Sequence, residues 1–358
     1  MKSQLEGGPA VRSDVLGGSG VRGPARYPAD PGTSIRSAVP PGGGGDLFLR
    51  AAGNPLLTAQ RWPDPVNAVL NPGAALVGGV TVLLCRVEDR RGISELTVAR
   101  SADGVSNWVA DRTPLLSPSA GHPQEAWGME DPRITRVDEL GRWVIAYTAY
   151  GPQGPAVALA TTRDFTSVQR LGVVRAPEDK NAALLPRRVG GDFILFHRPV
   201  SVIGGRPGVW LSRSTDLRGW AAPEPVFGPR PGGWWDSARV GIGPPPIETP
   251  EGWLVIYHGV RDTTAGALCR VGLLLLDLHN PTVVRTRSAE WMLGPTEPYE
   301  LTGNVPGVVF PSGLTHHPDT DELRLYYGTA NTCVAMATAR LAAVLTHLLT
   351  QPTPEPRT

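Results

Sequence analysis

The chain of 358 residues is poor in lysine and has no long apolar run. Lys2 and Lys180 are its only lysines, so arginine supplies nearly all of the basic side chains. The 34 basic residues balance 33 acidic ones, which argues against a general nucleic-acid binder because such proteins carry a basic excess. No run of 18 apolar residues occurs, so we expect neither a transmembrane helix nor a membrane partner.

Cysteine is also scarce. Cys85, Cys269 and Cys333 fit neither the spacing of a zinc site nor a disulfide framework, so we expect no metal. A reducing, cytoplasmic setting is the simplest interpretation. The N-terminal residues contain no continuous apolar stretch of the kind found in a secretory signal, so we expect none.

Glycine and proline are abundant, with 43 and 37 residues, which indicates many turns. Residues 1–46 contain few hydrophobic side chains and end in a stretch rich in proline and glycine. Such a segment cannot bury enough apolar surface to offset its ordering entropy. We therefore predict a disordered tail over 1–46, a single folded domain over 47–350 and a short tail over 351–358.

A short apolar run recurs five times at intervals of 50 to 69 residues. Each run has the length of a strand, is rich in β-branched or aromatic residues and ends in a polar or aromatic residue. The runs cover 82–86, 144–148, 194–198, 255–259 and 324–328. We predict one strand for each run.

A second repeat follows the first four runs and ends each time in aspartate, at Asp103, Asp164, Asp216 and Asp277. A strand, a polar turn with aspartate and another strand are typical of an antiparallel blade. Five such units predict an all-β fold, a five-bladed β-propeller. A β-sandwich is the alternative, although sandwiches do not repeat a composite unit. Residues 338–349 have helical spacing and predict a short C-terminal helix.

Basic side chains recur where the apolar runs end. In a propeller the innermost strands line a central channel, so we treat these ends as channel-lining. They hold Arg86, His197, Arg198 and His258. An unpaired buried charge is costly, so these residues predict a bound anion rather than core packing.

Three further segments are candidates for a site. Glu130 and Asp131 precede Pro132, and the position before proline predicts an extended Asp131 with a fixed side-chain direction; a turn aspartate is the plainer alternative. Lys180 is the one lysine of the folded part, which hints at a need for a compact ammonium group unless its position is chance. The pair Trp234-Trp235 suits either a sugar ring or a hydrophobic plug.

Several motifs, in colinear order from about Asn54 to Leu341, resemble those of glycoside hydrolase family 130. They are Asn71-Pro72-Gly73-Ala74, Gly128-Met129-Glu130-Asp131-Pro132-Arg133, Lys180 with His197-Arg198-Pro199, the stretch 235–246, Tyr257-His258-Gly259-Val260 and Val305-Pro306-Gly307-Val308-Val309-Phe310-Pro311. The family has a five-bladed β-propeller fold, which agrees with the repeat count. Most characterised members are β-mannoside phosphorylases and some are β-1,2-mannosidases.

The resemblance also implies roles for individual residues. Asp131 would be the general acid, with its proton passing through a mannose hydroxyl to the glycosidic oxygen. The phosphate-binding positions map onto Lys180, Arg198, Arg239 and His258. The sugar-binding positions map onto Asn71, Arg86, Glu130 and Asn331, where Asn331 replaces the family's common aspartate. The implied partners are an oligosaccharide and inorganic phosphate as co-substrate, with no cofactor, and family members are often homo-oligomers.

The kind of reaction follows from which charged groups are present. An inverting hydrolase needs one carboxyl group to protonate the leaving group and a second to activate water. A phosphorylase can omit the second, because phosphate is already a charged nucleophile, but needs cations to position it. The basic set therefore favours phosphorolysis. A hydrolase using Asp236 or Glu248 as its second carboxylate, and a non-catalytic sugar-binding propeller, are the alternatives.

Overall fold

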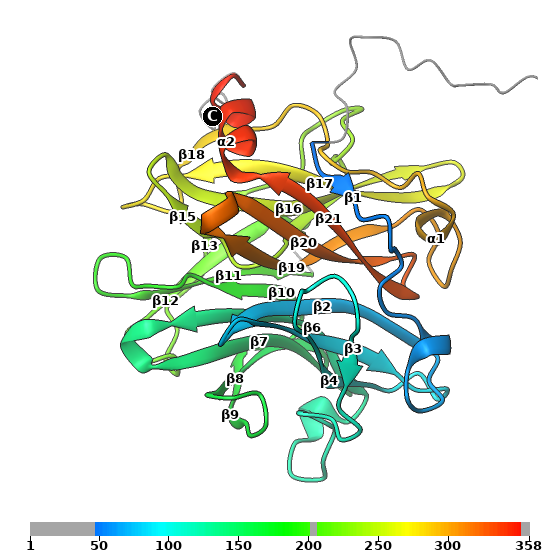
Figure 1. Ribbon diagram of the computed structural model, residues 1–358. Helices are drawn as coiled ribbons and strands as arrows, with labels where there is room; N and C mark the ends of the chain where they lie inside the picture. Colours follow the sequence, from blue (N-terminus) through cyan, green and yellow to red (C-terminus); the bar gives the residue numbers. More distant parts are fainter. Residues whose placement is uncertain (1–46, 201–205, 352–358) are drawn as a thin grey trace, which may run out of the picture. The chain divides into compact units, whose positions relative to one another are not determined.

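The computed structural model describes residues 47–200 and 206–351, and this part of the chain is nearly all β with few helices (Figure 1). The predicted N-terminal tail, 1–46, lies outside the described residues. So does the predicted C-terminal tail, apart from Gln351.

The strands form five consecutive antiparallel units, and in the first four the paired strands follow one another in chain order apart from β15. The first unit is β2 (Ala68–Val77), β3 (Val80–Glu88), β4 (Ser94–Ser101) and β5 (Val109–Ala110). The second is β6 (Gly128–Val137), β7 (Arg142–Gly151), β8 (Gly154–Thr162) and β9 (Gln169–Arg175). A single parallel residue pair, Ser94 with Gly128, joins these two units into one eight-stranded sheet.

Three more sheets complete the described fold. The third unit is β10 (Asp179–Leu184), β11 (Phe193–Pro199), β12 (Val209–Ser214) and β13 (Glu224–Phe227). The fourth is β14 (Arg239–Ile242), β16 (Gly252–Thr263), β17 (Gly266–Leu276) and β18 (Val284–Arg287), with β15 (Ile247–Thr249) paired to β16. The fifth is β19 (Val309–His317), β20 (Glu322–Thr329) and β21 (Cys333–Arg340), and the N-terminal β1 (Leu49–Arg50) is its fourth strand (Figure 1).

All five predicted runs lie in strands, and each lies in the second strand of its unit: β3, β7, β11, β16 and β20. The runs are therefore not the first strands of their units. Contacts between units pass mainly through the first strands, because β19 contacts β2, β2 contacts β6, β6 contacts β10 and β10 contacts β14. The sheets themselves do not close into a ring among the described residues.

The predicted aspartate turns are confirmed in the first four units. Each aspartate accepts hydrogen bonds from the backbone N–H groups two and three residues later, as Asp103 does from Val105 and Ser106 at 2.8 Å. Asp164, Asp216 and Asp277 make the same pair of bonds. An aspartate that bonds its own following backbone stabilises a tight turn, which is why the repeat marks the ends of strands.

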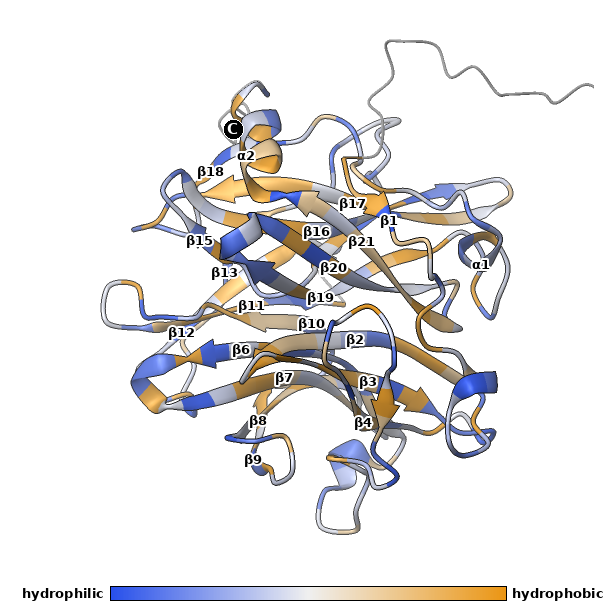
Figure 2. Ribbon diagram, in the orientation of Figure 1, coloured by the Kyte–Doolittle hydropathy of each residue, from blue (hydrophilic) through white to orange (hydrophobic). Residues whose placement is uncertain are grey.

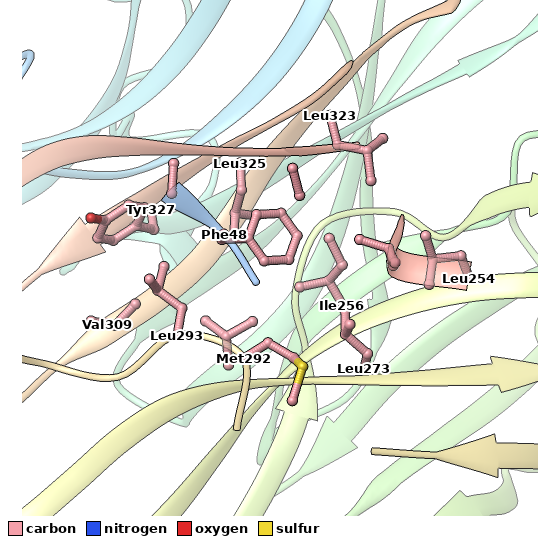
Figure 3. Packing of buried hydrophobic residues seen from close by; sticks show 14 of the residues in the cluster. Phe48, Leu254, Ile256, Leu273, Met292, Leu293, Val309, Leu323, Leu325 and Tyr327 are labelled. Carbon is pink, nitrogen blue, oxygen red and sulfur yellow. The ribbon is translucent and has the colours of Figure 1, made fainter. Parts of the chain in front are cut away.

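Apolar residues lie along many of the strands, and polar residues mark several of the connecting loops (Figure 2). Between the fourth and fifth units, Phe48 packs with Ile256 and Leu273 on one side and with Leu325 and Tyr327 on the other (Figure 3). All five side chains are buried. This packing fixes the start of the described chain, and with it β1, against the last two sheets.

Helices are few and short. The predicted C-terminal helix is α2 (Leu341–Leu349), which buries Val344 and Leu348, while 338–340 extend β21. The others are α1 (Pro298–Leu301) and the 3-10 turns η1 (Ala59–Arg61), η2 (Pro123–Glu125), η3 (Asp138–Leu140) and η4 (Pro318–Thr320). Among the described residues no helix has the length and apolar character needed to cross a membrane.

Candidate active site

Four first strands, β2, β6, β10 and β19, have a register shift near their start, and in the first three the shift is a bulge at a residue with a positive φ angle. The register shifts at 70–73 in β2, at 130–133 in β6 and at 180–183 in β10. The bulged residues have positive φ angles, 45° at Asn71, 49° at Asp131 and 55° at Asn181. Asn and Asp tolerate this left-handed region better than other residues with a side chain. Bulges next to active sites redirect side chains, so these three positions define one candidate site.

The bulge corrects one expectation from the sequence. Asp131 precedes Pro132 but is not extended, because its φ of 49° is left-handed. The extra residue that the bulge inserts into β6 takes this conformation, and the preference imposed by the following proline is overridden. The side chain is still held in one direction, but by the bulge.

Asp131 is buried and sits at the centre of a group of polar side chains. The Asn71 amide donates to Oδ1 of Asp131 at 2.7 Å, and Nη1 of Arg86 lies 3.5 Å from the same oxygen. Nη2 of Arg86 also contacts Glu130 at 3.0 Å and Glu88 at 3.2 Å. The structure therefore brings together four of the predicted residues, Asn71, Arg86, Glu130 and Asp131, around one guanidinium group.

The two adjacent carboxyl groups differ in acidity. Burial raises the pKa of Glu130 above its ordinary value, and the neighbouring Asp131 charge adds to that rise against the opposing effect of Arg86. Burial also acts to raise the pKa of Asp131, but the positive charges of Arg86 and Arg133 and the Asn71 hydrogen bond hold it below its ordinary value. Asp131 is thus the more acidic of the pair.

The buried Arg133 holds the backbone of Asp131 in place. Its side chain is fully buried, and it donates from Nη1 to the Asp131 carbonyl at 2.9 Å and from Nε to the Gly243 carbonyl at 2.6 Å. Its guanidinium lies 5.4 Å from the ring centre of Phe310. Burial lowers the pKa of Arg133 to about 10. These contacts connect the Asp131 backbone to the fourth and fifth units.

A second group of the site is cationic. Lys180 on β10 pairs across the sheet with Arg198 on β11. With its amide oxygen turned toward Arg198, Asn181 accepts from Nη2 and Nε at 3.2 Å each. Arg198 is buried, and burial followed by the charge of Arg239 lowers its pKa to about 10. The two guanidinium groups repel each other, and an anion bound between or beside them would relieve this repulsion.

His258 lies beside these cations. Its ring is buried, lies 4.6 Å from the Phe310 ring and places Nε2 3.5 Å from the Asn181 amide. Nδ1 has no hydrogen-bond partner among the described residues. Burial and then the charge of Arg198 hold the pKa of His258 well below its ordinary value. A neutral imidazole with one ring nitrogen unsatisfied is suited to an incoming polar ligand.

Arg239 begins β14 at the rim of this group. Its side chain is 41% exposed and lies 3.5 Å from Asp262. The charge of Arg239 lowers the pKa of both Arg198 and His258. The charge of Lys180 lowers the pKa of both Asp131 and His258. The four predicted phosphate-binding residues therefore form one group that borders the carboxylates.

Asn331 lies in the turn between β20 and β21, beside the first strand of the first unit. Thr332 in the same turn accepts a backbone hydrogen bond from Val69 at 3.2 Å. The Asn331 carbonyl accepts from the Asn304 side chain at 3.1 Å, and its φ is 51°. The nearby Gly328 packs directly on the Asn71 side chain. The turn therefore lies next to the cluster of polar side chains around Asp131.

His197 is not part of the site. Adjacent residues in a strand point to opposite faces, so His197 and Arg198 cannot both face it. His197 is fully buried, with Nδ1 2.6 Å from Asp179 and Nε2 3.0 Å from Ser212. It belongs to a polar contact inside the third unit.

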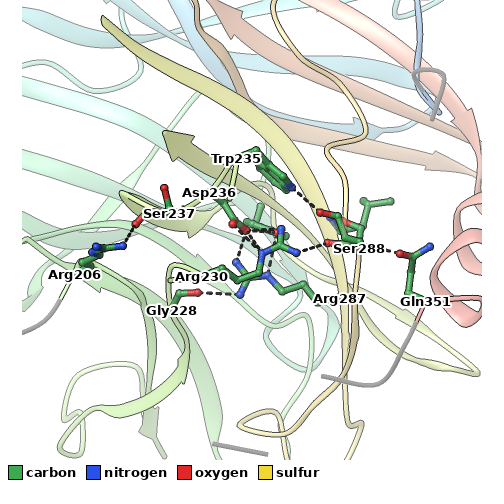
Figure 4. A network of polar contacts seen from close by, with 12 residues as sticks. Arg206, Gly228, Arg230, Trp235, Asp236, Ser237, Arg287, Ser288 and Gln351 are labelled. Atoms are coloured by element: carbon green, nitrogen blue, oxygen red, sulfur yellow. Dashed lines mark hydrogen bonds and ion pairs between the residues drawn. The ribbon is translucent and has the colours of Figure 1, made fainter. Parts of the chain in front are cut away.

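Neither alternative second carboxylate lies free beside Asp131. Asp236 is fully buried, and contacts Arg230 at 2.9 Å, Arg287 at 2.6 Å and the Tyr257 hydroxyl at 2.9 Å (Figure 4). Glu248 on β15 forms a bidentate ion pair with Arg187 at 2.6 and 2.7 Å. Both carboxylates are occupied by structural ion pairs.

Sequence reasoning missed Arg133 and Phe310 as parts of the site and gave Asn181 no role. One signal was present, because the first two bulges share the pattern of Asn or Asp before proline at Asn71-Pro72 and Asp131-Pro132. Among the described residues no group of three or more His, Cys, Asp and Glu side chains is arranged to hold a metal ion.

Fold and site together define a class of protein: a nearly all-β protein with a buried aspartate, Asp131, and a half-buried glutamate, Glu130, beside a group of cations. A family model described as beta-1,4-mannooligosaccharide phosphorylase matches residues 55–349. The chain therefore belongs to glycoside hydrolase family 130, as the sequence motifs predicted.

Similar proteins have related names. A 1,2-beta-oligomannan phosphorylase of Thermoanaerobacter sp. (strain X514) is 35% identical over 280 residues, covering 75% of this chain and 89% of its own length. A beta-1,4-mannooligosaccharide phosphorylase of Ruminococcus albus is 33% identical over 301 residues, with 82% and 88% covered. The structure of beta-1,2-mannobiose phosphorylase from Listeria innocua, in complex with beta-1,2-mannobiose, superposes with a TM-score of 0.78 at 28% identity, with 85% and 99% covered.

Proposed function

We propose that this protein is a β-mannoside phosphorylase that cleaves its substrate with inorganic phosphate and inverts the anomeric centre, giving α-mannose 1-phosphate. The observation that carries the proposal is the group of three cations, Lys180, Arg198 and Arg239, with the neutral His258, beside the buried Asp131. A phosphate dianion supplies the negative charge that balances these positive side chains. The names of the relatives support the same reaction and the same class of substrate.

In this reaction an oxygen of phosphate forms a bond to the anomeric carbon while the bond to the glycosidic oxygen breaks. The electron pair goes to the leaving oxygen, which gains a proton. Asp131 provides that proton, through a mannose hydroxyl. Asn71, Arg86, Glu130 and Asn331 hold the mannosyl residue. The enzyme thereby transfers a mannosyl group to phosphate and needs no metal or organic cofactor.

Hydrolysis is the weaker alternative, because it requires a carboxylate free to activate water. Asp236 and Glu248 are both held in ion pairs away from Asp131. Glu130 is adjacent to Asp131 in sequence, but its carboxylate is paired with Arg86. A phosphate-binding group serves no purpose in a hydrolase, whereas a phosphorylase depends on it.

We also propose that the five antiparallel units are the blades of a β-propeller, within a single catalytic domain over 47–350. The contacts from each first strand to the next, from β19 through β2, β6 and β10 to β14, support this arrangement. So does the pairing of β1 with β21, because a strand from the N-terminus then completes the last unit.

The direct test is incubation with β-1,2- and β-1,4-mannobiose, with and without phosphate. We expect mannose 1-phosphate that forms only with phosphate. Free mannose released at the same rate without phosphate would show a hydrolase. Binding of either disaccharide without any turnover would favour a sugar-binding protein instead.

A further inference from the structure

A separate hollow lies on the fourth unit, outside the residues assigned to catalysis. It has a volume of about 390 Å³ and is lined chiefly by Trp234, Trp235, Arg261, Glu290 and Trp291. Small-molecule sites generally occupy roughly 300–1,000 Å³, so the hollow is large enough for a ligand. Trp234 is 44% exposed and Trp291 is 40% exposed, although large aromatic side chains usually bury most of their surface.

The two exposed indoles are held in place by their neighbours. The Arg230 guanidinium lies 4.1 Å from the Trp234 ring centre and is itself fixed by the ion pair with Asp236 (Figure 4). The Arg270 guanidinium lies 4.2 Å from the Trp291 ring centre, and Trp235 meets Trp291 edge to face at 6.5 Å. Aromatic surfaces that are already fixed lose little conformational entropy when a ligand binds.

Trp235 itself is the plug that the sequence allowed for. It is buried, stacks on Tyr257 at 5.7 Å and donates from its indole N–H to the Ala289 carbonyl at 2.9 Å. The two indoles beside it are therefore supported from the core. Of the three indoles, Trp234 and Trp291 are the two that present surface to solvent.

The hollow and the proposed phosphate-binding residues lie on opposite faces of β16. A Cβ on Gly259 would meet the Trp235 ring at 2.5 Å, so the Gly259 face of the strand turns toward the hollow. Arg261 shares that face, while His258 points to the other. Three residues of strand separate His258 from Arg261, a distance of about 10 Å. The two features are close but are divided by the sheet.

We propose that this hollow is a second carbohydrate site that binds mannosyl residues of a longer β-manno-oligosaccharide away from the bond being cleaved. A pyranose ring offers an apolar C–H face that packs on an indole and a rim of hydroxyls for charged planar groups. Trp234 and Trp291 supply the apolar surfaces, and Arg261 and Glu290 supply the rim. The identity of the sugar rests on the proposed function.

The test compares substrates of two lengths. We would measure phosphorolysis of mannobiose and mannohexaose, in both the β-1,2- and the β-1,4-linked series, for the wild type, Trp291→Ala and Arg261→Ala. Loss of one aromatic contact is expected to raise the KM for the hexaose about threefold to tenfold. The kinetics on mannobiose should not change. Trp291→Phe, which keeps an aromatic face, should recover most of the affinity.

Arg261 is exposed, so its replacement should leave the fold intact. Arg112→Ala, which removes a similarly exposed arginine from the first unit, is the matched control and should alter neither KM. An unchanged hexaose KM in both Trp291→Ala and Arg261→Ala would overturn the proposal. An equal loss on mannobiose would also overturn it, because the hollow would then act through the cleavage site.

Direct binding separates this proposal from the proposed function. Calorimetric titration of Asp131→Asn with mannohexaose should show binding that Trp291→Ala weakens, even if the wild type releases no mannose 1-phosphate. Turnover of mannobiose by the wild type without such Trp291-dependent binding would leave the function standing and refute the second site.

Discussion

Gly328→Ala offers a sharp test of the site, because it perturbs Asn71 without touching any charged group. Gly328 on β20 packs against the Asn71 side chain. A Cβ at this position would overlap Oδ1 of Asn71 and lie 2.9 Å from its Cγ. The amide must then move, and its hydrogen bond to Asp131, now 2.7 Å, breaks.

The size of the effect follows from that bond. A hydrogen bond to a charged group contributes about 1.5–3 kcal/mol. If the Asn71 contact orients Asp131 in the transition state, kcat/KM for phosphorolysis falls by about 10- to 150-fold. The protein should stay folded, with a loss of about 1–3 kcal/mol in the free energy of urea unfolding from the tighter packing.

Two further variants assign the effect to Asn71. Gly53→Ala is the matched control, because an added Cβ there meets no atom within 4 Å and should change nothing. In an Asn71→Gly background, which allows the positive φ and removes the side chain, Gly328→Ala should add little further loss. A folded Gly328→Ala enzyme with kcat/KM within about twofold of the wild type would refute the reasoning.

Four other substitutions give distinct outcomes. Asp131→Asn should lower mannose 1-phosphate release by about 10²- to 10⁴-fold while the protein stays folded. Arg198→Lys, which removes the fork bonded to Asn181, should raise the KM for phosphate about tenfold and leave that for the mannoside nearly unchanged. Asp236→Ala breaks a buried ion pair and should cost about 3–5 kcal/mol of unfolding free energy in urea. Because the pKa of His258 is depressed only in the folded protein, stability should fall as pH drops below 6.5, and His258→Gln should flatten this fall in urea unfolding between pH 5 and 8.

Each of these four outcomes has a clear opposite. Full activity of Asp131→Asn would show that Asp131 is not the general acid. An unchanged KM for phosphate in Arg198→Lys would show that Arg198 does not bind phosphate. An Asp236→Ala protein that is stable yet inactive would return Asp236 to the list of catalytic carboxylates. A pH dependence of stability that is the same with and without His258 would mean that other groups cause it.

The strands and turns could be predicted because their signals are local. A run of β-branched residues predicts a strand, and an aspartate that bonds the backbone two residues later predicts the turn after it. The order of strands within a unit is not local. The apolar runs proved to be second strands, because the first strands are interrupted by bulges and by proline at Pro72 and Pro132 and so lack a continuous apolar pattern.

The same bulges explain which site residues could be found. Asp131, Lys180 and His258 stood out as unusual residues in unusual places, and the structure brings them to one site. Arg133 was missed because nothing in the sequence separates a buried arginine that holds carbonyl groups from an exposed one. His197 was wrongly included, since its neighbour Arg198 takes the face that points toward the site and leaves His197 in the core.

The charges of the site indicate how nucleophile and acid could depend on each other. Arg86, Arg133 and the Asn71 hydrogen bond keep Asp131 ionised, yet a general acid must carry a proton. Lys180 also lowers the pKa of Asp131, and the same charge acts on His258. A phosphate dianion bound among Lys180, Arg198 and His258 offsets these positive charges and so raises the pKa of both groups. In the proposed function, phosphate binding therefore favours the protonated form of Asp131 that a general acid requires.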